Sequence, residues 1–217
     1  MLIDIFHDTV CPWCRIGKKH LFDALAQWQG QAVTIRWHPF LLDNTIPPEG
    51  YEFRSFMQAR KEINPQQLKQ MFEYTSRAGE AAGVKLKFDK IRLAVNTTLS
   101  HRLIALAPES IKSTVVEAIY KAYFEDGLNI GDIDILVALG ETVGMNSTEL
   151  RRQLSGNTAL DEVVAEASFA RLNGIASVPY FIINNKIKLD GSHSVKMFLQ
   201  ALSYAAFMDN VNHNSLV

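Results

Sequence analysis

The stretch Leu2-Ile3-Asp4-Ile5-Phe6-His7-Asp8-Thr9-Val10-Cys11-Pro12-Trp13-Cys14 decides the fold, because a strand runs directly into a pair of cysteines at the start of a helix. Residues 2–6 are apolar and β-branched, as in a buried strand. From Pro12 to about Gln27 apolar side chains recur at helical spacing, and proline is favoured at the first helical position. Residues 32–38 alternate like a second strand. The pattern predicts two parallel strands joined by a helix with a right-handed crossover.

The two cysteines of the chain, Cys11 and Cys14, predict redox chemistry. A bridge between them closes a very short loop and adds little stability, so a structural staple is the weaker interpretation. Their spacing along a helix places both side chains on one face. Cys11 lies at the predicted helix N-terminus, where free N–H groups and the helix dipole favour a thiolate. We therefore predict that Cys11 attacks a disulfide and that Cys14 resolves the mixed disulfide.

Composition excludes several other classes of protein. The 217 residues suffice for one domain with a sizeable core, or for a core domain with a large insertion. The net charge of -1 gives no attraction for nucleic acid or an anionic membrane. A zinc site needs four ligands, whereas the sequence has a single cysteine pair and scattered histidines. The N-terminal apolar run is broken by Asp4, unlike a secretory signal, and no segment approaches the roughly 20 apolar residues of a membrane helix. We expect a cytoplasmic protein without metal, nucleic-acid or membrane partners.

The remainder of the chain predicts a helical block followed by a hairpin. Helical patterns separated by glycine and proline cover residues 51–61, 65–82, 96–107, 110–125, 132–143, 147–155 and 158–172. Strand patterns over 180–183 and 186–189 flank Asn184-Asn185, which predicts a tight hairpin turn. A closing helix over 194–206 and a loose tail over 208–217 complete the chain.

This order of elements is that of an α/β, thioredoxin-like fold with a large helical insertion. The thioredoxin-like domain is expected to comprise residues 1–40 and 156–207. The inserted helical domain is expected over residues 41–155.

Further motifs lie along nearly the whole chain. They are Ile35-Arg36-Trp37-His38-Pro39-Phe40, Pro47-Pro48-Glu49-Gly50, Asn96-Thr97 with His101-Arg102-Leu103, Ala122-Tyr123-Phe124-Glu125 with Asn129-Ile130-Gly131-Asp132, and Ser177-Val178-Pro179-Tyr180-Phe181. Together with the cysteine motif they resemble the DsbA-like superfamily, and more closely its FrnE-like branch of dithiol–disulfide isomerases. In that superfamily the proline matching Pro179 is cis and faces the dithiol, and the backbone of the residue before it pairs with an extended substrate. The resemblance implies Val178 and Pro179 as substrate-binding residues, beneath a helical lid.

Five other residues are candidates for the site. Pro12 and Trp13 lie between the cysteines, where residue identity helps to set redox poise; Trp13 could equally be a packed aromatic. Asp8 could accept a proton from the resolving thiol or cap the helix, and we favour capping. For Asn96 and His101 we favour a helix cap and a half-buried surface histidine, the alternative being a place on the rim of the active site.

One position departs from the family pattern. The well-known oxidase and thioredoxin branches carry a buried acid six residues before the nucleophile, and Ile5 occupies that position here. Proton handling for Cys14 must then differ, through Asp8 or through water.

We expect thiol–disulfide exchange with a disulfide-containing protein or a low-molecular-weight thiol or disulfide. No cofactor is expected beyond the redox-active cysteines, while glutathione stays open as a co-substrate. The alternative is a glutathione-dependent transferase or isomerase of the kappa-class type, in which the first cysteine position is usually serine. A reducing cytosol suits reduction or isomerisation better than net oxidation. Both monomer and homodimer stay open.

Overall fold

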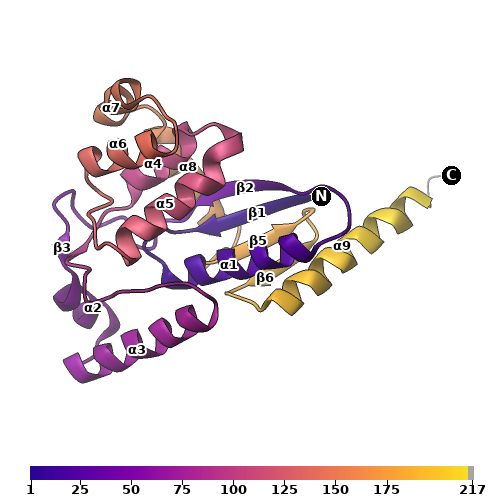
Figure 1. Ribbon diagram of the computed structural model, residues 1–217, viewed down its shortest axis with the longest axis horizontal. Coiled ribbons are helices and arrows are strands. Elements are labelled where there is room, and N and C mark those ends of the chain that lie inside the picture. The colour runs from indigo at the N-terminus through magenta and orange to yellow at the C-terminus, as the bar shows by residue number, and fades with distance from the viewer. Residues whose placement is uncertain (215–217) are drawn as a thin grey trace.

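The centre of the molecule is a four-stranded sheet of β1 (Leu2–His7), β2 (Thr34–Pro39), β5 (Tyr180–Ile183) and β6 (Ile187–Asp190) (Figure 1). The computed structural model describes residues 1–214. The strand order is β2-β1-β5-β6. β1 is parallel to β2 and antiparallel to β5, which in turn is antiparallel to β6. The predicted parallel pair is therefore confirmed.

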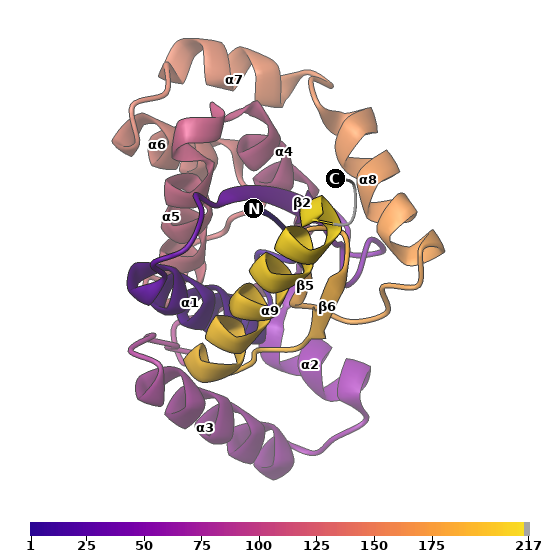
Figure 2. The same ribbon diagram turned by 90° about the vertical axis from the view of Figure 1, so that its right-hand side faces the viewer.

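Two helices, α1 (Pro12–Gln27) and α9 (Val195–Asn214), pack side by side against the sheet (Figures 1 and 2). α1 connects β1 to β2. Gly17 permits its close approach, because a Cβ atom there would lie 3.0 Å from Pro179 Cγ and 3.2 Å from Phe181 Cζ. The first turns of α1 therefore lie directly against Pro179 and the start of β5.

The chain between β2 and β5 is mainly helical. Its elements are α2 (Phe53–Lys61), α3 (Pro65–Ala81), α4 (Thr98–Leu106), the 3-10 turn η1 (Glu109–Ile111), α5 (Lys112–Phe124), α6 (Ile133–Thr142), α7 (Ser147–Ser155) and α8 (Leu160–Leu172). α2 and α3 lie at one end of the molecule and α4 to α7 at the opposite end, with the sheet between them (Figures 1 and 2). Among residues 1–214, no helix has the length and apolar character needed to cross a membrane.

These helices agree with the predicted ones except near their ends. One difference is at residues 51–52, where the sequence pattern predicts a helix. They form β3 (Tyr51–Glu52), which pairs antiparallel with β4 (Leu93–Ala94). Strands this short have no periodicity that a sequence pattern could reveal.

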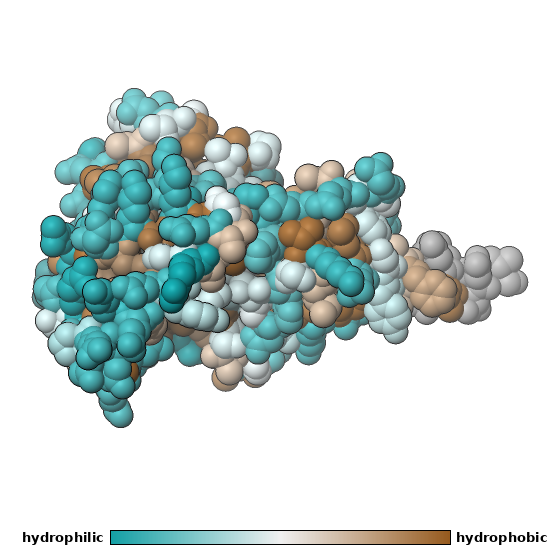
Figure 3. Space-filling model, turned by 60° about the horizontal axis from the view of Figure 1, so that its bottom comes forward, coloured by the Kyte–Doolittle hydropathy of each residue, from teal (hydrophilic) through white to brown (hydrophobic). Residues whose placement is uncertain are grey.

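α3 is amphipathic. Leu68, Phe72 and Thr75 are buried on one side of the helix. The surface over α3 is mainly hydrophilic (Figure 3). The helix begins with a capping box between Asn64 and Gln67, in which each side chain hydrogen bonds to the backbone of the other residue. α3 therefore presents one apolar face to the interior, and residues of that face line part of the candidate active site.

The predicted hairpin turn is confirmed. Asn184 and Asn185 have φ angles of 49° and 56°, and the Lys186 amide donates to the Ile183 carbonyl at 3.0 Å. Positive φ at both central residues is the geometry of a type I′ turn, which asparagine tolerates.

The predicted loose tail over 208–217 is wrong for residues 208–214, which continue α9. Asp209 explains the longer helix, because its carboxylate accepts hydrogen bonds from Asn184 Nδ2 at 2.6 Å and Lys186 Nζ at 2.9 Å. These contacts tie α9 to the hairpin turn. Residues 215–217 lie outside the described part of the chain.

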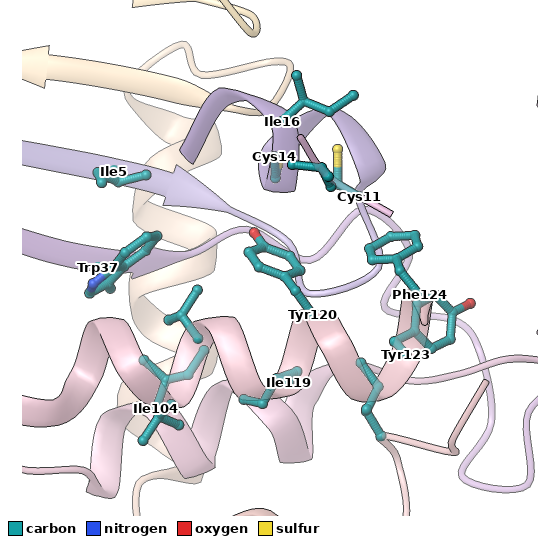
Figure 4. Close-up of a cluster of buried hydrophobic side chains, with 14 of the residues drawn as sticks. Ile5, Cys11, Cys14, Ile16, Trp37, Ile104, Ile119, Tyr120, Tyr123 and Phe124 are labelled. Atoms are coloured by element: carbon teal, nitrogen blue, oxygen red, sulfur yellow. The ribbon is translucent and has the colours of Figure 1, made fainter. Parts of the chain in front are cut away.

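A hydrophobic core runs from the sheet into the helical segments (Figure 4). It joins Ile5 of β1 to Tyr120 and Phe124 of α5. Cys11 and Cys14 belong to the same cluster. The dithiol therefore lies where the sheet, α1 and the inserted helices meet.

Candidate active site

The two cysteines occupy the first turn of α1. Cys11 is the N-cap residue, and Cys14 follows within the helix. The amides of Cys14 and Arg15 donate to the Cys11 carbonyl at 3.1 and 3.3 Å. Both thiols are free and buried, with 5% of Cys11 and 2% of Cys14 exposed. The first turn of α1 lies over Tyr120 and Phe124 of α5 (Figure 4). The structure is thus that of a reduced dithiol at a helix N-terminus.

Pro179 faces this dithiol, as the resemblance implies. The Val178–Pro179 peptide bond is cis. The Cys11 thiol donates to the Val178 carbonyl with an Sγ–O distance of 3.7 Å. The backbone of Val178 therefore contacts the Cys11 sulfur, while its predicted role in holding substrate stays a prediction.

A hollow of about 370 Å³ opens beside Cys11. Its walls are mainly apolar, and its lining includes Val178, Pro12 and Trp13. The inserted helices contribute Phe53, Phe56 and Met57 from α2 and Met71, Phe72 and Thr75 from α3. Cys14 is not among the described residues that line it. One sulfur of the pair therefore borders the hollow and the other lies beneath it.

Trp13 is partly buried and does two things. Its ring centroid lies 6.0 Å from that of Tyr74 on α3, and its side chain also lines the hollow. It is thus both a packed aromatic and part of the hollow wall.

The environment of the cysteines keeps Cys14 protonated. Burial raises the pKa of Cys14 well above its ordinary value, and the hydrogen bond with Cys11 raises it further. Since a thiol attacks as its thiolate, this environment makes Cys14 the weaker nucleophile.

Asp8 does not cap α1, so that prediction is wrong. The helix has no side-chain cap, and the Cys11 amide donates instead to the Asp8 carbonyl at 3.1 Å. The Asp8 carboxylate turns away and accepts a hydrogen bond from the Leu42 amide at 2.7 Å. The side chain is 1% exposed and also borders the hollow. It is therefore a buried acid beside the hollow.

Asn96 is not the cap of α4, so that prediction is wrong: the N-cap residue is Thr97, and the helix has no side-chain cap. Asn96 lies one residue earlier, where its Oδ1 accepts from the Thr98 amide at 3.0 Å and its Nδ2 donates to the Ile46 carbonyl at 2.7 Å. It ties the segment before α4 to the loop before α2, and it is not among the described residues that line the hollow.

His101 is fully buried, with 3% of its surface exposed, so the expected half-buried surface position is wrong. Its Nε2 lies 3.5 Å from Asp8 Oδ1. Its ring centroid is 5.2 Å from that of His7, whose Nδ1 is hydrogen bonded to the Tyr120 hydroxyl at 2.8 Å. A polar cluster of four side chains thus lies behind the dithiol, and neither His7 nor Tyr120 has a local sequence signal that predicts it.

Comparisons with known proteins agree with this geometry. A family model described as "DSBA-like thioredoxin domain" matches residues 2–203. The uncharacterized protein YwbO of Bacillus subtilis is 27% identical over 210 residues, which cover 93% of this chain and 95% of YwbO.

Two solved structures share the fold. The probable DsbA oxidoreductase SCO1869 from Streptomyces coelicolor has a TM-score of 0.87 and 26% identity, and the match covers 94% of this chain and 89% of that one. The cytosolic disulfide reductase DsbM from Pseudomonas aeruginosa, solved with GSH, has a TM-score of 0.62 and 17% identity, with 98% of this chain and 100% of that chain covered. The family match over almost all of the sequence, together with the Cys-x-x-Cys pair opposite a cis-proline, shows that the chain belongs to the family of DSBA-like thioredoxin domains.

Proposed function

We propose that the protein is a cytoplasmic thiol–disulfide oxidoreductase that reduces or isomerises disulfides, with Cys11 as the nucleophile and Cys14 as the resolving thiol. The observation that carries this proposal is the asymmetry of the two sulfurs. Cys11 borders the hollow at a helix N-terminus, where the helix dipole stabilises a thiolate. Cys14 lies beneath it, 2% exposed and with a raised pKa.

The exchange has two steps. The Cys11 thiolate attacks one sulfur of the substrate disulfide, that S–S bond breaks, and the other sulfur leaves as a thiolate while a mixed disulfide forms. Cys14 then loses its proton and attacks the Cys11 sulfur, which forms the Cys11–Cys14 disulfide and releases the second substrate thiol. Two electrons pass to the substrate. Two molecules of a low-molecular-weight thiol such as glutathione would return the protein to the dithiol.

The surroundings of Cys11 favour an extended disulfide-containing segment or a small disulfide with an apolar portion. The Val178 backbone next to the sulfur is suited to pairing with a substrate backbone, which gives affinity without demanding one sequence. The apolar hollow would hold a neighbouring side chain. The motifs that resemble FrnE-like proteins favour reduction or isomerisation. The GSH in the DsbM structure, and the description of DsbM as cytosolic, support glutathione as co-substrate and the cytoplasm as compartment.

Replacing Cys14 with serine is expected to trap the reaction at its first step. Cys11 would still attack, but no buried thiol would remain to release the adduct. Incubation of C14S with glutathione disulfide or a peptide disulfide should give a mixed disulfide on Cys11 as the main species in intact-protein mass spectra. The wild-type protein should instead give the intramolecular disulfide.

The matched control is C11S, which retains the buried thiol and should form no adduct on the same timescale. A C14S protein without adduct, beside an active wild type, would contradict the assigned order of attack. An adduct on Cys14 in C11S would contradict it as well.

The direction of electron flow is a separate expectation. Equilibration of the wild-type protein with glutathione buffers should give a reduction potential for the Cys11–Cys14 couple below about −220 mV, within the range of the cytosolic glutathione pool. In this range the glutathione pool keeps part of the protein in the dithiol form, and the dithiol can donate electrons to disulfides of higher potential. A potential of about −120 mV, which is typical of the strong oxidant DsbA, would refute the reducing direction while leaving exchange chemistry intact.

A further inference from the structure

Cys14 has to lose its proton before it attacks the mixed disulfide, because the thiolate is the nucleophile. Burial and the hydrogen bond with Cys11 raise its pKa, so the proton does not leave unaided. Ile5, at the position where related branches carry a buried acid, is 1% exposed and lies in the hydrophobic core. The acceptor is therefore either another side chain near the dithiol or water.

Asp8 is the carboxylate next to the dithiol. Its carbonyl accepts a hydrogen bond from the Cys11 amide at 3.1 Å, and the charge of its carboxylate is among the causes of the raised pKa of Cys14. Oδ2 is bound to the Leu42 amide at 2.7 Å. Among the described residues, the polar contacts of Oδ1 are those with Thr9 Oγ1 and His101 Nε2, both at 3.5 Å. Because such contacts are at the limit of hydrogen bonding, Oδ1 is free to accept a proton.

Two buried imidazoles lie behind Asp8. The Nε2 atoms of His101 and His7 are both buried, and neither has a hydrogen-bond partner within residues 1–214. Burial, together with the nearby His101, lowers the pKa of His7 well below its ordinary value, so His7 is neutral. A neutral imidazole carries one donor and one acceptor nitrogen and can pass a proton through its ring. Unpartnered buried nitrogens are uncommon in proteins and need an explanation, such as a catalytic role or a bound water.

A small cavity of about 50 Å³ lies beside the imidazoles. Its lining includes His7 and His101 and two carboxylates of α8, the exposed Glu162 and the half-buried Glu166. A volume of this size holds a water molecule when polar partners are present. Its side chains do not form a metal-ligand set among the described residues. The cavity is separate from the hollow that borders Cys11.

We propose that Asp8 and the His101–His7 pair form a proton-exit route for the resolving thiol. This inference rests on the proposed exchange function. As Cys14 attacks the Cys11 sulfur, its proton moves to Asp8 Oδ1, the Cys11–Cys14 bond forms, and the substrate thiolate leaves. Asp8 then passes the proton to Nε2 of His101, and the opposite nitrogen of that ring releases a proton to water in the cavity and to the α8 carboxylates. Asp8 acts as the catalytic base, His101 relays the proton, and His7, whose Nδ1 is bound to Tyr120, positions the His101 ring.

The other ionisable groups near this route do not compete for the proton. Burial raises the pKa of Tyr120 and of Tyr123, so both α5 hydroxyls stay protonated and cannot act as bases. The remaining charged or titratable neighbours are Cys11 and Lys18 of α1, His38 of β2, and Lys112 of α5 at the outer end of the cavity.

The test follows the two steps of exchange separately. Reduced protein is mixed with Ellman's reagent in a stopped-flow instrument, where the first thionitrobenzoate reports attack by Cys11 and the second reports resolution by Cys14. In D8N the second release should slow about 10²-fold at neutral pH, the scale of general base catalysis, and should recover as pH rises. The first release should change by less than about threefold. Asparagine can still accept from the Leu42 amide, so the fold should persist.

Asp4 supplies the matched control. It is another buried acid, 4% exposed, and it lies within β1, where its carboxylate is bound to Arg36 and His38. D4N should leave both releases unchanged. H101Q should slow only the second release, about tenfold, as expected when one link of a proton relay is weakened.

A purely electrostatic role for Asp8 predicts the opposite change in the rate of the second release. If Asp8 acts only through its charge, D8N would lower the pKa of Cys14 and accelerate the second release at neutral pH. An accelerated or unchanged second release in D8N, or an unchanged one in H101Q, overturns the proton route. Loss of the first release in the wild type would instead refute the proposed exchange function itself.

Discussion

Replacing Cys11 with serine should abolish disulfide reduction, with activity falling by more than about 10³-fold, the scale seen when a covalent nucleophile is removed. A hydroxyl is a far weaker nucleophile than a thiolate at neutral pH, and the helix N-terminus does not compensate for that difference. The remaining thiol cannot substitute, because Cys14 is 2% exposed, does not border the hollow and has a raised pKa. Insulin reduction monitored by turbidity, or release from Ellman's reagent, measures the loss.

The substitution should leave the fold intact, because serine is nearly isosteric with cysteine and the Sγ–Val178 carbonyl contact of 3.7 Å is a weak one. The thermal midpoint should therefore move by only a few degrees. The result also separates the two function classes that the sequence leaves open. A glutathione-dependent transferase or isomerase of the kappa-class type would tolerate serine at position 11. Retained activity in C11S would thus refute the dithiol mechanism and favour that alternative.

The helices and strands that position the dithiol can be predicted from local patterns in the sequence. Pro12 is the first residue of α1, as helix preferences require, and the Asn184-Asn185 pair forms the tight turn that positions β5 beside β1. The cis bond before Pro179 follows only from the resemblance, because a proline before a strand is usually trans. The C-terminal end of α9 cannot be predicted from a local pattern, because Asp209 is hydrogen bonded to residues that are distant in the sequence.

The polar cluster behind the dithiol cannot be predicted from local patterns, because its contacts join distant parts of the chain. His7 and Tyr120 are separated by 113 positions, and Asp8 and Leu42 by 34. The capping role predicted for Asp8 is wrong for a further reason: an acidic residue shortly before a helix is a common capping signal, whatever its side chain contacts in the folded protein. Only the folded chain shows that its carboxylate turns toward the loop after β2 and toward α4.

Arg102 is expected to be the side chain whose loss most destabilises the inserted helices. It lies on α4, 4% exposed, and its guanidinium donates to the carbonyl groups at the end of α7 and in the turn to α8. The acceptors and distances are Thr158 (2.8 Å), Leu154 (3.2 Å), Gln153 (2.8 Å) and Gly156 (2.6 Å). The final carbonyl groups of a helix have no partners within it, so these bonds act as a cap. R102M would keep much of the packing volume but leave these acceptors without a donor.

The free energy of unfolding of R102M should fall by about 2–4 kcal/mol, because unsatisfied buried polar groups cost roughly 1–3 kcal/mol each. Urea denaturation at neutral pH measures the change. R152M is the matched control, since Arg152 lies on α7 itself but is exposed and paired only with Glu149, and its loss should not move the denaturation midpoint measurably. α7 is remote from α1 (Figure 1), so the rate of the first thiol exchange in folded R102M should equal that of the wild type. Equal midpoints for R102M and R152M would show that the carbonyl groups find other partners and that Arg102 is not the cap of α7.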